Sequence, residues 1–387
     1  MSDVTAMIGA SVFDGQRRHE KAALLLRGPD SLGVVDEINI PSGATRFELD
    51  GGVLVPGFVD LQVNGGGGVQ FNTEPTAEGI ATICRAHRRF GTTSLLPTLI
   101  TDKTEITRSA VAAGVEAARR SVPGFVGLHL EGPHLSVAKK GAHDPALIRA
   151  MTREDLEHVV SASSVLPHLM MTVAPETVSN ASIQVLAENG ITVSLGHSAA
   201  SMAMAHDAVD AGASCVTHLF NAMSPFDHRE PGLVGAALEE GALSAGIIAD
   251  GIHVDPAAMA IALRAKAGPG KIFLITDAMA TLGTEATAFT LNGRTIKRKN
   301  GRLTLGDGTL AGADLDMISA VRIMSETVGV GLDEALRMAS LYPAQVIGAD
   351  RRLGHLGPGA AANIVHLDDS FHVQRVWIGG QPVHTGP

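Results

Sequence analysis

From Val53 onward, short apolar runs alternate with alanine-rich segments, and this alternation restricts the fold more than any other feature. Eight runs have the length and composition of buried strands: VLVPGFVDLQVNG, TSLLPT, FVGLHLE, HLMMTVAPE, TVSLGH, SCVTHL, SAGIIAD and KIFLITD. Helix-like segments such as ATICRAHRRF and SIQVLAENG lie between most of them, and several end in a glycine that suits a helix C-cap. The sequence therefore predicts an α/β fold, a (β/α)8 TIM-type barrel over 56–345, rather than an open sheet.

The two ends of the chain have a different sequence pattern, in which short segments typical of β-strands are separated by turns that contain glycine, proline and aspartate. KAALLLRG, LGVVDEINI and TRFELDG lie near the N-terminus, and GPGAAANIVHLD and FHVQRVWIGGQPV near the C-terminus. We expect 1–55 and 346–387 to pair into one small, discontinuous β-sandwich domain. Within the barrel segment, NG turns between alternating residues predict a β-hairpin insertion around 286–310.

Four of the strand-like runs end in a polar residue that can bind a metal or act in acid–base catalysis. FVGLHLE ends in Glu131, TVSLGH in His197, SCVTH in His218 and KIFLITD in Asp277. The C-terminal ends of barrel strands lie at one rim, where active sites collect, so we expect these side chains to meet. One carboxylate and two imidazoles suit a catalytic Zn²⁺ with an open position, and the remaining carboxylate would serve as a base. An inert hydrogen-bonded cluster is the alternative, but it would bury charge without a cation.

Composition and charge exclude several classes of function. Hydrophobic residues make up 45% of the 387 residues, yet no apolar run approaches the roughly 18 needed to cross a bilayer, so we expect a soluble protein without a membrane partner. No secretion signal is visible at the N-terminus, which predicts a cytoplasmic location. The net charge of −10 disfavours a nucleic-acid partner. Cys84 and Cys215 are expected to be buried free thiols rather than a disulfide.

Seven sequence blocks together resemble a known family. They are PGFVDLQVNGGGGVQFN, HLEGPHLSVAKKGAHDP, LGHSAAS, VTHLFNAMSPFDHREPG, IIADGIHV, LITDAMA and GTLAGADLDM. In this order they resemble the motifs of the N-acetylglucosamine-6-phosphate deacetylase family, within the amidohydrolase superfamily, over nearly the whole chain. The resemblance implies metal-dependent hydrolysis of the N-acetyl group of N-acetyl-D-glucosamine 6-phosphate to D-glucosamine 6-phosphate and acetate, in amino-sugar catabolism and recycling.

The resemblance also implies a ligand set and two catalytic residues. Glu131, His197 and His218 match residues that hold one divalent ion per subunit, with Zn²⁺ expected and Fe²⁺ or Mn²⁺ as alternatives. Asp277 matches the base that takes a proton from water and passes it to the departing amine. His253 in ADGIHV matches a histidine that contacts the substrate beside the metal and stabilises the oxyanion.

Two positions depart from the pattern of most amidohydrolases, in which the first barrel strand ends in an HxH pair that binds a second metal. Gln62 and Asn64 stand at the corresponding positions here. Because neutral amides are poor ligands for Zn²⁺, we expect these second-metal positions to be vacated and the site to resemble the single-metal branch of the superfamily.

The resemblance further implies how the sugar phosphate is held. Arg229 is the expected phosphate partner, because guanidinium forks fit phosphate oxygens. In the family the equivalent arginine can reach across a dimer interface, which implies a homodimer. The substrate contacts are, in chain order, Ala142, His143, Asn221, Ala222, Arg229, His253, Leu310, Ala311 and Gly312.

Two other functions compete with this interpretation. Another amidohydrolase, acting on a cyclic amide or on a different N-acetylated sugar phosphate such as N-acetylgalactosamine 6-phosphate, would keep the metal residues and change the substrate contacts. A non-catalytic sugar-phosphate-binding protein would not need Asp277 as a base. The glycine run 65–68 lacks the Lys-Ser/Thr of a phosphate-binding P-loop, and a flexible loop beside the site is the favoured interpretation.

Overall fold

Eight parallel strands form the central sheet of the protein, whose computed structural model describes residues 4–386. Neighbours in the sheet follow the chain order, and the backbone N–H of Asp277 donates to the carbonyl oxygen of Gln62 at 3.0 Å, which brings the last strand back to the first. All eight predicted runs contribute, so the predicted barrel is confirmed. The strands are β8 (Phe58–Val63), β11 (Thr92–Ile100), β12 (Leu128–Glu131), β13 (Leu169–Val173), β14 (Thr192–Leu195), β15 (Cys215–Val216), β16 (Ser244–Ile248) and β17 (Ile272–Ile275).

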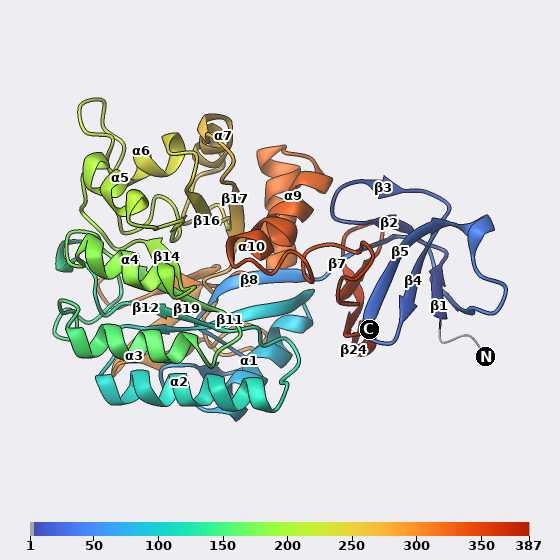
Figure 1. The fold of residues 1–387 in the computed structure, drawn as a ribbon, viewed down its shortest axis with the longest axis horizontal. Coiled ribbons are helices and arrows are strands. Elements are labelled where there is room, and N and C mark those ends of the chain that lie inside the picture. The colour runs from blue at the N-terminus through green and yellow to red at the C-terminus, as the bar shows by residue number, and fades with distance from the viewer. Residues whose placement is uncertain (1–3, 387) are drawn as a thin grey trace.

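A helix follows each barrel strand and covers the outside of the barrel (Figure 1). Six of these eight helices begin at a Ser, Thr or Asp whose side chain accepts a backbone N–H of the first turn, as the residue preference for N-caps predicts. None of the helices within residues 4–386 is both long and apolar enough to cross a membrane. The eight are α1 (Ala77–Arg88), α2 (Thr104–Arg119), α3 (Arg153–Ser163), α4 (Asn180–Glu188), α5 (Met202–Asp210), α6 (Gly232–Glu239), α7 (Pro256–Ala265) and α8 (Met317–Arg322).

Both ends of the chain contribute to a second, smaller β structure beside the barrel, where the blue and red ribbons meet in Figure 1. A six-stranded sheet has the order β24-β23-β22-β7-β2-β3, and a four-stranded sheet has the order β5-β4-β1-β6. Leu24 of one sheet and Leu54, Ile364 and Trp377 of the other share one buried core, so the predicted β-sandwich is confirmed. The strands are β1 (Val4–Ile8), β2 (Ser11–Phe13), β3 (Arg18–His19), β4 (Ala22–Arg27), β5 (Asp30–Asp36), β6 (Thr45–Glu48), β7 (Val53–Pro56), β22 (Ile364–Leu367), β23 (Val373–Ile378) and β24 (Gln381–Thr385).

The run VLVPGFVDLQVNG is two strands rather than one. Its first part is β7 in the small sheet and its second part is β8 in the barrel, with Gly57 between them. A Cβ atom at Gly57 would lie 2.0 Å from the Thr93 hydroxyl, so the chain can pass from one sheet to the other here only without a side chain. The domain boundaries predicted at 55/56 and 345/346 stay predictions, and residues 1–3 and 387 of the two terminal segments lie outside the described residues.

Four antiparallel strands follow the barrel's last strand and lie over its mouth. They are β18 (Ala288–Leu291), β19 (Arg294–Lys299), β20 (Arg302–Thr304) and β21 (Leu310–Ala313). Leu291, Ile296 and Leu303 from this sheet form a buried cluster with Ile100 and Met279 of the barrel. The inserted sheet therefore supplies an apolar wall at the barrel rim. The chain returns through the π-helical segment Ile323–Val328, α9 (Leu332–Ala339) and α10 (Leu341–Val346).

A buried imidazole on α1 makes the stability of the fold depend on pH. His87 is 1% exposed and its Nε2 lies 2.9 Å from the carbonyl oxygen of Gly65. Burial lowers the pKa of His87 from its ordinary 6.5 to about 4. His87 therefore binds a proton more tightly in the unfolded chain than in the folded one. Its contribution to the free energy of unfolding is complete above pH 6.5 and is lower by about 2 kcal/mol at pH 5.

We expect the thermal midpoint to fall less between pH 7.5 and pH 5 in His87→Gln than in the wild type, because the substituted side chain does not titrate. Circular dichroism melts at the two pH values give both falls. All other titrating groups are common to the two proteins and cancel in the comparison. Equal falls would contradict the assignment of this acid sensitivity to His87.

Candidate functional site

A pocket of about 250 Å³ lies at the C-terminal ends of the barrel strands. Every predicted site residue lines it except Gln62 and Arg229. The pocket also has apolar walls that the sequence analysis missed, because isoleucine, leucine and methionine in these segments are indistinguishable from ordinary core residues until the fold is known. Those walls are Ile100, Ile248, Met279 and Leu291.

Three ligand-type atoms meet at the bottom of the pocket. Oε1 of Glu131 lies 3.1 Å from Nε2 of His197 and 3.1 Å from Nε2 of His218, and the two Nε2 atoms are 3.1 Å apart. Atoms bound tetrahedrally to one ion at about 2.0–2.1 Å stand about 3.3 Å from one another. All three side chains are buried. Their spacing therefore fits the ligands of a single ion.

The protonation of these imidazoles shows why a cation suits the cluster. Nδ1 of His197 lies 2.8 Å from the carbonyl oxygen of Lys139, so Nδ1 carries a proton and Nε2 is the nitrogen whose lone pair can bind a cation. This lone pair faces the carboxylate of Glu131 and Nε2 of His218. One proton on His218 can satisfy only one of the contacts, and within residues 4–386 its buried Nδ1 has no hydrogen-bond partner. A divalent cation satisfies all three atoms at once.

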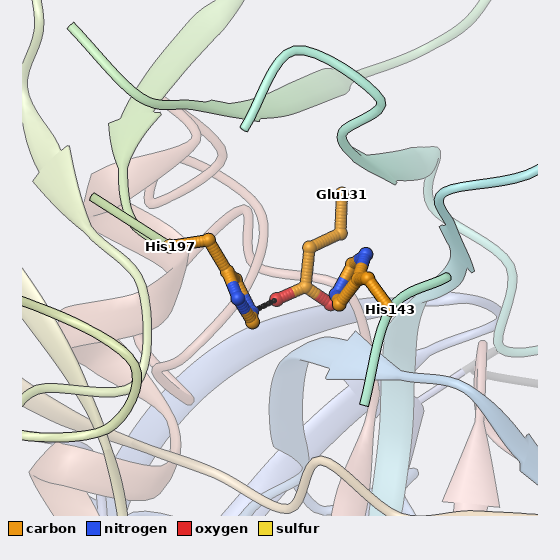
Figure 2. Close-up of side chains that lie close together, drawn as sticks. All are labelled: Glu131, His143 and His197. Carbon is orange, nitrogen blue, oxygen red and sulfur yellow. Dashed lines mark hydrogen bonds and ion pairs between the residues drawn. The ribbon is translucent and has the colours of Figure 1, made fainter. Parts of the chain in front are cut away.

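His143 is the other imidazole close to this centre. One ligand atom each from Glu131, His143 and His197 lie within 4.8 Å of one another, and Figure 2 shows the Glu131 carboxylate between the two rings. The 3.1 Å contacts of His218 are the tighter set and match the spacing expected around one ion. Nδ1 of His143 lies 2.7 Å from the Thr101 hydroxyl, and the centroid of its ring lies 4.3 Å from that of His197, with the two ring planes tilted by 59°.

Two amide side chains connect the two carboxylates of the site. Nε2 of Gln62 lies 3.2 Å from each carboxylate oxygen of Glu131 and 3.1 Å from Oδ1 of Asp277. Nδ2 of Asn64 lies 2.6 Å from the same Oδ1. Because carboxylates accept hydrogen bonds, both amides act here as N–H donors. Their contacts are those of groups that position the two carboxylates.

The two carboxylates have opposite pKa shifts. Burial alone would raise the pKa of Glu131, but the neighbouring imidazoles of His197 and His218 hold it well below its ordinary value. Burial, reinforced by the negative charge of Glu131, raises the pKa of Asp277 from 3.8 to about 6. Glu131 thus stays ionised as a metal ligand must, whereas Asp277 can gain and lose a proton near neutral pH.

The backbone is strained where the site residues leave their strands. His197, His218 and Asp277 follow β14, β15 and β17 with φ of +47°, +30° and +50°. Such conformations cost about 1–3 kcal/mol each in a residue other than glycine and collect at functional sites. Gly132, after Glu131, has φ of +87°, and a Cβ there would lie 2.3 Å from the Thr101 hydroxyl. These turns aim the side chains across the mouth of the barrel.

His253 is paired with an acid that was not among the predicted site residues. Oδ2 of Asp250 lies 2.6 Å from Nδ1 of His253, and both side chains are 7% exposed. Burial would raise the pKa of Asp250, but the hydrogen bond from His253 lowers it below its ordinary value. Nδ1 therefore carries a proton, and Nε2 is the nitrogen left for a ligand. The three-residue spacing in ADGIH was the signal that could have revealed this pair.

We expect Asp250→Asn to lower kcat by about 10²-fold, the loss typical of a donor that stabilises developing charge. The amide can no longer accept a charge-assisted hydrogen bond from Nδ1 of His253 and so holds the ring less firmly in its orientation. The rate of substrate turnover measured against pH, together with metal content, separates this effect from collapse of the site. Metal content should not change, and Asp250→Glu should recover part of the activity. A kcat within twofold of the wild type would show that the pair has no part in the reaction.

Arg229 lies apart from the pocket. It sits in the exposed loop between β15 and α6, where its backbone N–H donates to Asp227 at 3.0 Å. Within one chain the side chain does not line the catalytic pocket. The expected phosphate contact is thus not formed inside the single chain that the structure describes.

The glycine run is a small hairpin that does not offer a phosphate cradle. β9 (Gly65–Gly66) pairs with β10 (Val69–Gln70). The backbone N–H groups of Gly67 and Gly68 donate to the carbonyl oxygens of Leu282 and Ala280 at 2.8 Å each. Because these donors are engaged, they are not available to an anion.

Known proteins resemble this chain over most of its length. The profile of the Amidohydrolase family matches residues 53–383. N-acetylgalactosamine-6-phosphate deacetylase of Shewanella sp. (strain ANA-3) is 44% identical over 87% of this chain and 84% of that protein. N-acetylglucosamine-6-phosphate deacetylase of Homo sapiens is 39% identical over 87% of this chain and 85% of that protein. The crystal structure of N-acetylglucosamine-6-phosphate deacetylase from Pasteurella multocida has a TM-score of 0.95 and 35% identity, covering 99% of this chain and 100% of that one.

Proposed function

The chain belongs to the amidohydrolase family and is a hydrolase, and from this premise we propose that it removes the N-acetyl group of N-acetyl-D-glucosamine 6-phosphate, giving D-glucosamine 6-phosphate and acetate. One observation carries the proposal. The carboxylate of Asp277 shares the donor Gln62 with Glu131, so a base stands beside the cluster of Glu131, His197 and His218 in one pocket. A sugar-phosphate-binding protein would not need a base at that place.

Amide hydrolysis requires that a water loses a proton and that the departing amine gains one. When bound by the cluster, a divalent ion lowers the pKa of water towards neutrality and polarises the acetyl carbonyl. Asp277 takes the proton from the attacking water and gives it to the amine nitrogen as the C–N bond breaks. Asn64 and Gln62 both donate to Oδ1, so Oδ2 remains for this proton. We propose that His253, oriented by the contact of its Nδ1 with Asp250, donates a hydrogen bond from Nε2 to the carbonyl oxygen as that oxygen gains charge.

One divalent ion per subunit is the cofactor that we propose, with Zn²⁺ as the first choice. A buried carboxylate with two imidazoles is a common ligand set of catalytic zinc and leaves one position open. Fe²⁺ and Mn²⁺ accept the same ligand types. Metal analysis of the purified enzyme, compared with activity after removal and return of each ion, identifies the one that supports turnover.

The substrate is an N-acetylated sugar phosphate, and the epimer at C4 is the point to test. N-acetyl-D-galactosamine 6-phosphate is the second candidate, favoured by the 44% identity to the Shewanella relative that is named for it. Acetate release measured side by side on the two epimers gives two values of kcat/KM. We expect the larger value for the gluco epimer. The reverse order would replace the proposed substrate with the galacto epimer, and release from neither would remove the deacetylase proposal.

A homodimer in which Arg229 reaches the phosphate in the partner's pocket accounts for its exposed position. We expect Arg229→Ala to raise KM for phosphorylated substrates by about 10-fold or more with little change in kcat, since a charge-assisted guanidinium contact contributes roughly 1.5–3 kcal/mol. An unchanged KM would place the phosphate site elsewhere.

Mixed dimers test whether the contact crosses the interface. A dimer of one Arg229→Ala chain and one Asp277→Asn chain contains one intact pocket if Arg229 acts on the partner's pocket. It contains none if Arg229 acts within its own chain. At a substrate concentration well below KM, where Arg229→Ala itself is strongly impaired, we expect about half of the wild-type activity per dimer from co-purified mixed dimers. Activity no greater than that of the two parent variants would contradict action across the interface.

A cytoplasmic location fits a substrate of this class. The phosphate group keeps such a sugar charged at neutral pH, and a charged solute does not cross a bilayer unaided. An enzyme that acts on it is therefore expected where sugars are phosphorylated. Cell fractionation with activity measurements tests this expectation.

A further inference from the structure

A second concave site of about 390 Å³ lies on the outside of the barrel and shares no lining residue with the catalytic pocket. Its charged lining consists of Arg85 and Arg88 in the last turn of α1 and Arg89, the C-cap of that helix, and its other titratable group is His384 on β24. Gly67 of the glycine hairpin and Gly283 complete two further sides. No carboxylate is among the described residues that line it. Four segments far apart in the sequence thus build a basic concavity in a chain of net charge −10.

The three arginines lack acidic partners. Within residues 4–386, none of them lies in an ion pair with an aspartate or glutamate. Their contacts are with neutral groups: Nη2 of Arg85 donates to the Thr82 hydroxyl at 2.8 Å, and Nη1 of Arg89 reaches the carbonyl oxygen of Gly283 at 3.5 Å. The neighbouring Arg120 of α2 instead pairs with both Glu78 and Glu116. The basic pocket therefore keeps its positive charge unneutralised.

This arrangement is unfavourable without a ligand. Arg85 is three residues from Arg88 and four from Arg89, the two spacings at which like charges on a helix repel. Burial and the charge of Arg85 lower the pKa of Arg88, and burial with the charges of Arg89 and Arg88 lowers the pKa of His384. The C-terminal end of the α1 dipole favours cations. The dipole of α1 does not explain why His384, which lies on a strand of the small domain, lines the same concavity.

We propose that this basic pocket binds a small anion that carries phosphate. Guanidinium groups match phosphate oxygens in geometry, and three of them around one concavity suit a group with two negative charges. A phosphate would place negative charge between groups that repel one another, so binding would remove the repulsion. The site is separate from the catalytic pocket, and the inference stands whether or not the proposed reaction is correct.

The experiment is equilibrium dialysis of the metal-loaded enzyme against ³²P-labelled inorganic phosphate at low ionic strength. It compares the wild type with the variant Arg85→Gln/Arg88→Gln/Arg89→Gln. A charge-matched control carries Arg27→Gln/Arg46→Gln/Arg264→Gln, three exposed arginines that line neither pocket and have no ion pair among the described residues. Binding in the catalytic pocket is common to all three proteins.

We expect the wild type and the control to bind one more phosphate per chain than the α1 variant does. His384→Gln gives an independent test that leaves α1 intact, and we expect it to weaken the additional site by several-fold. Equal binding by the wild type and the α1 variant would overturn the proposal. An equal loss in the charge-matched control would overturn it too, because net charge rather than the pocket would then account for the binding.

Discussion

Asp277→Asn is expected to lower kcat by about 10³-fold, while metal content and KM stay close to those of the wild type. A positioned acid–base group contributes about 10²–10⁴-fold, and here one carboxylate makes both proton transfers. The amide has nearly the same shape and can still be held beside Asn64 and Gln62, but it cannot take a proton from water. Acetate release under saturating substrate, with metal analysis of the same sample, measures the effect.

The matched control for this substitution is Asp316→Asn. Asp316 is a half-buried acid that caps α8, where asparagine serves about equally well, so kcat should change by less than about twofold. Near-normal turnover in Asp277→Asn would reject Asp277 as the base. Loss of metal together with loss of activity would show that the substitution disrupts the centre, and the role of Asp277 would then be structural.

His218→Ala is expected to remove the metal and with it all measurable turnover. The variant deletes one of three ligand atoms that stand 3.1 Å apart, leaving Glu131 and His197 as an incomplete set. Two protein ligands hold a divalent ion far more weakly than three, so the metal content should fall from about one ion per chain to near zero after dialysis. Mass-spectrometric metal analysis gives the result directly.

His143→Ala is the informative companion, because His143 is the other imidazole beside Glu131 and His197. If His218 is the third ligand, the His143 variant keeps its metal and loses affinity for substrate. A metal content that falls in His143→Ala and persists in His218→Ala would exchange the two roles. The same measurement on both proteins therefore decides the composition of the centre.

The barrel was predictable because its signals are local. Each strand buries both faces, so the runs read as continuous apolar segments, and the serine, threonine and aspartate caps mark where the helices begin. Glu131, His197, His218 and Asp277 stood out because each is a polar residue at the end of such a run. Chain order along a parallel barrel then placed all four at one rim.

Other structural features could not be predicted from single segments, because they depend on contacts between segments. VLVPGFVDLQVNG looks like one strand, and only the partner strands on either side of Gly57 divide it between two sheets. The NG turns predicted the hairpins of the insertion. They gave no indication that the apolar face of this sheet packs against Ile100 and Met279 above the pocket. The role of Asp250 also depends on a contact with His253 that the local turn creates.

The sequence by itself determined the order of the elements, the residue types able to bind a metal, and the amides at Gln62 and Asn64, because these follow from local periodicity and side-chain chemistry. Only the tertiary structure decided which atoms meet. It brought Oε1 of Glu131 and two Nε2 atoms to 3.1 Å, left Arg229 outside its own pocket, and gathered three arginines with His384. Distances between residues far apart in the chain depend on how strands and loops close in space, and short-range patterns do not encode that closure.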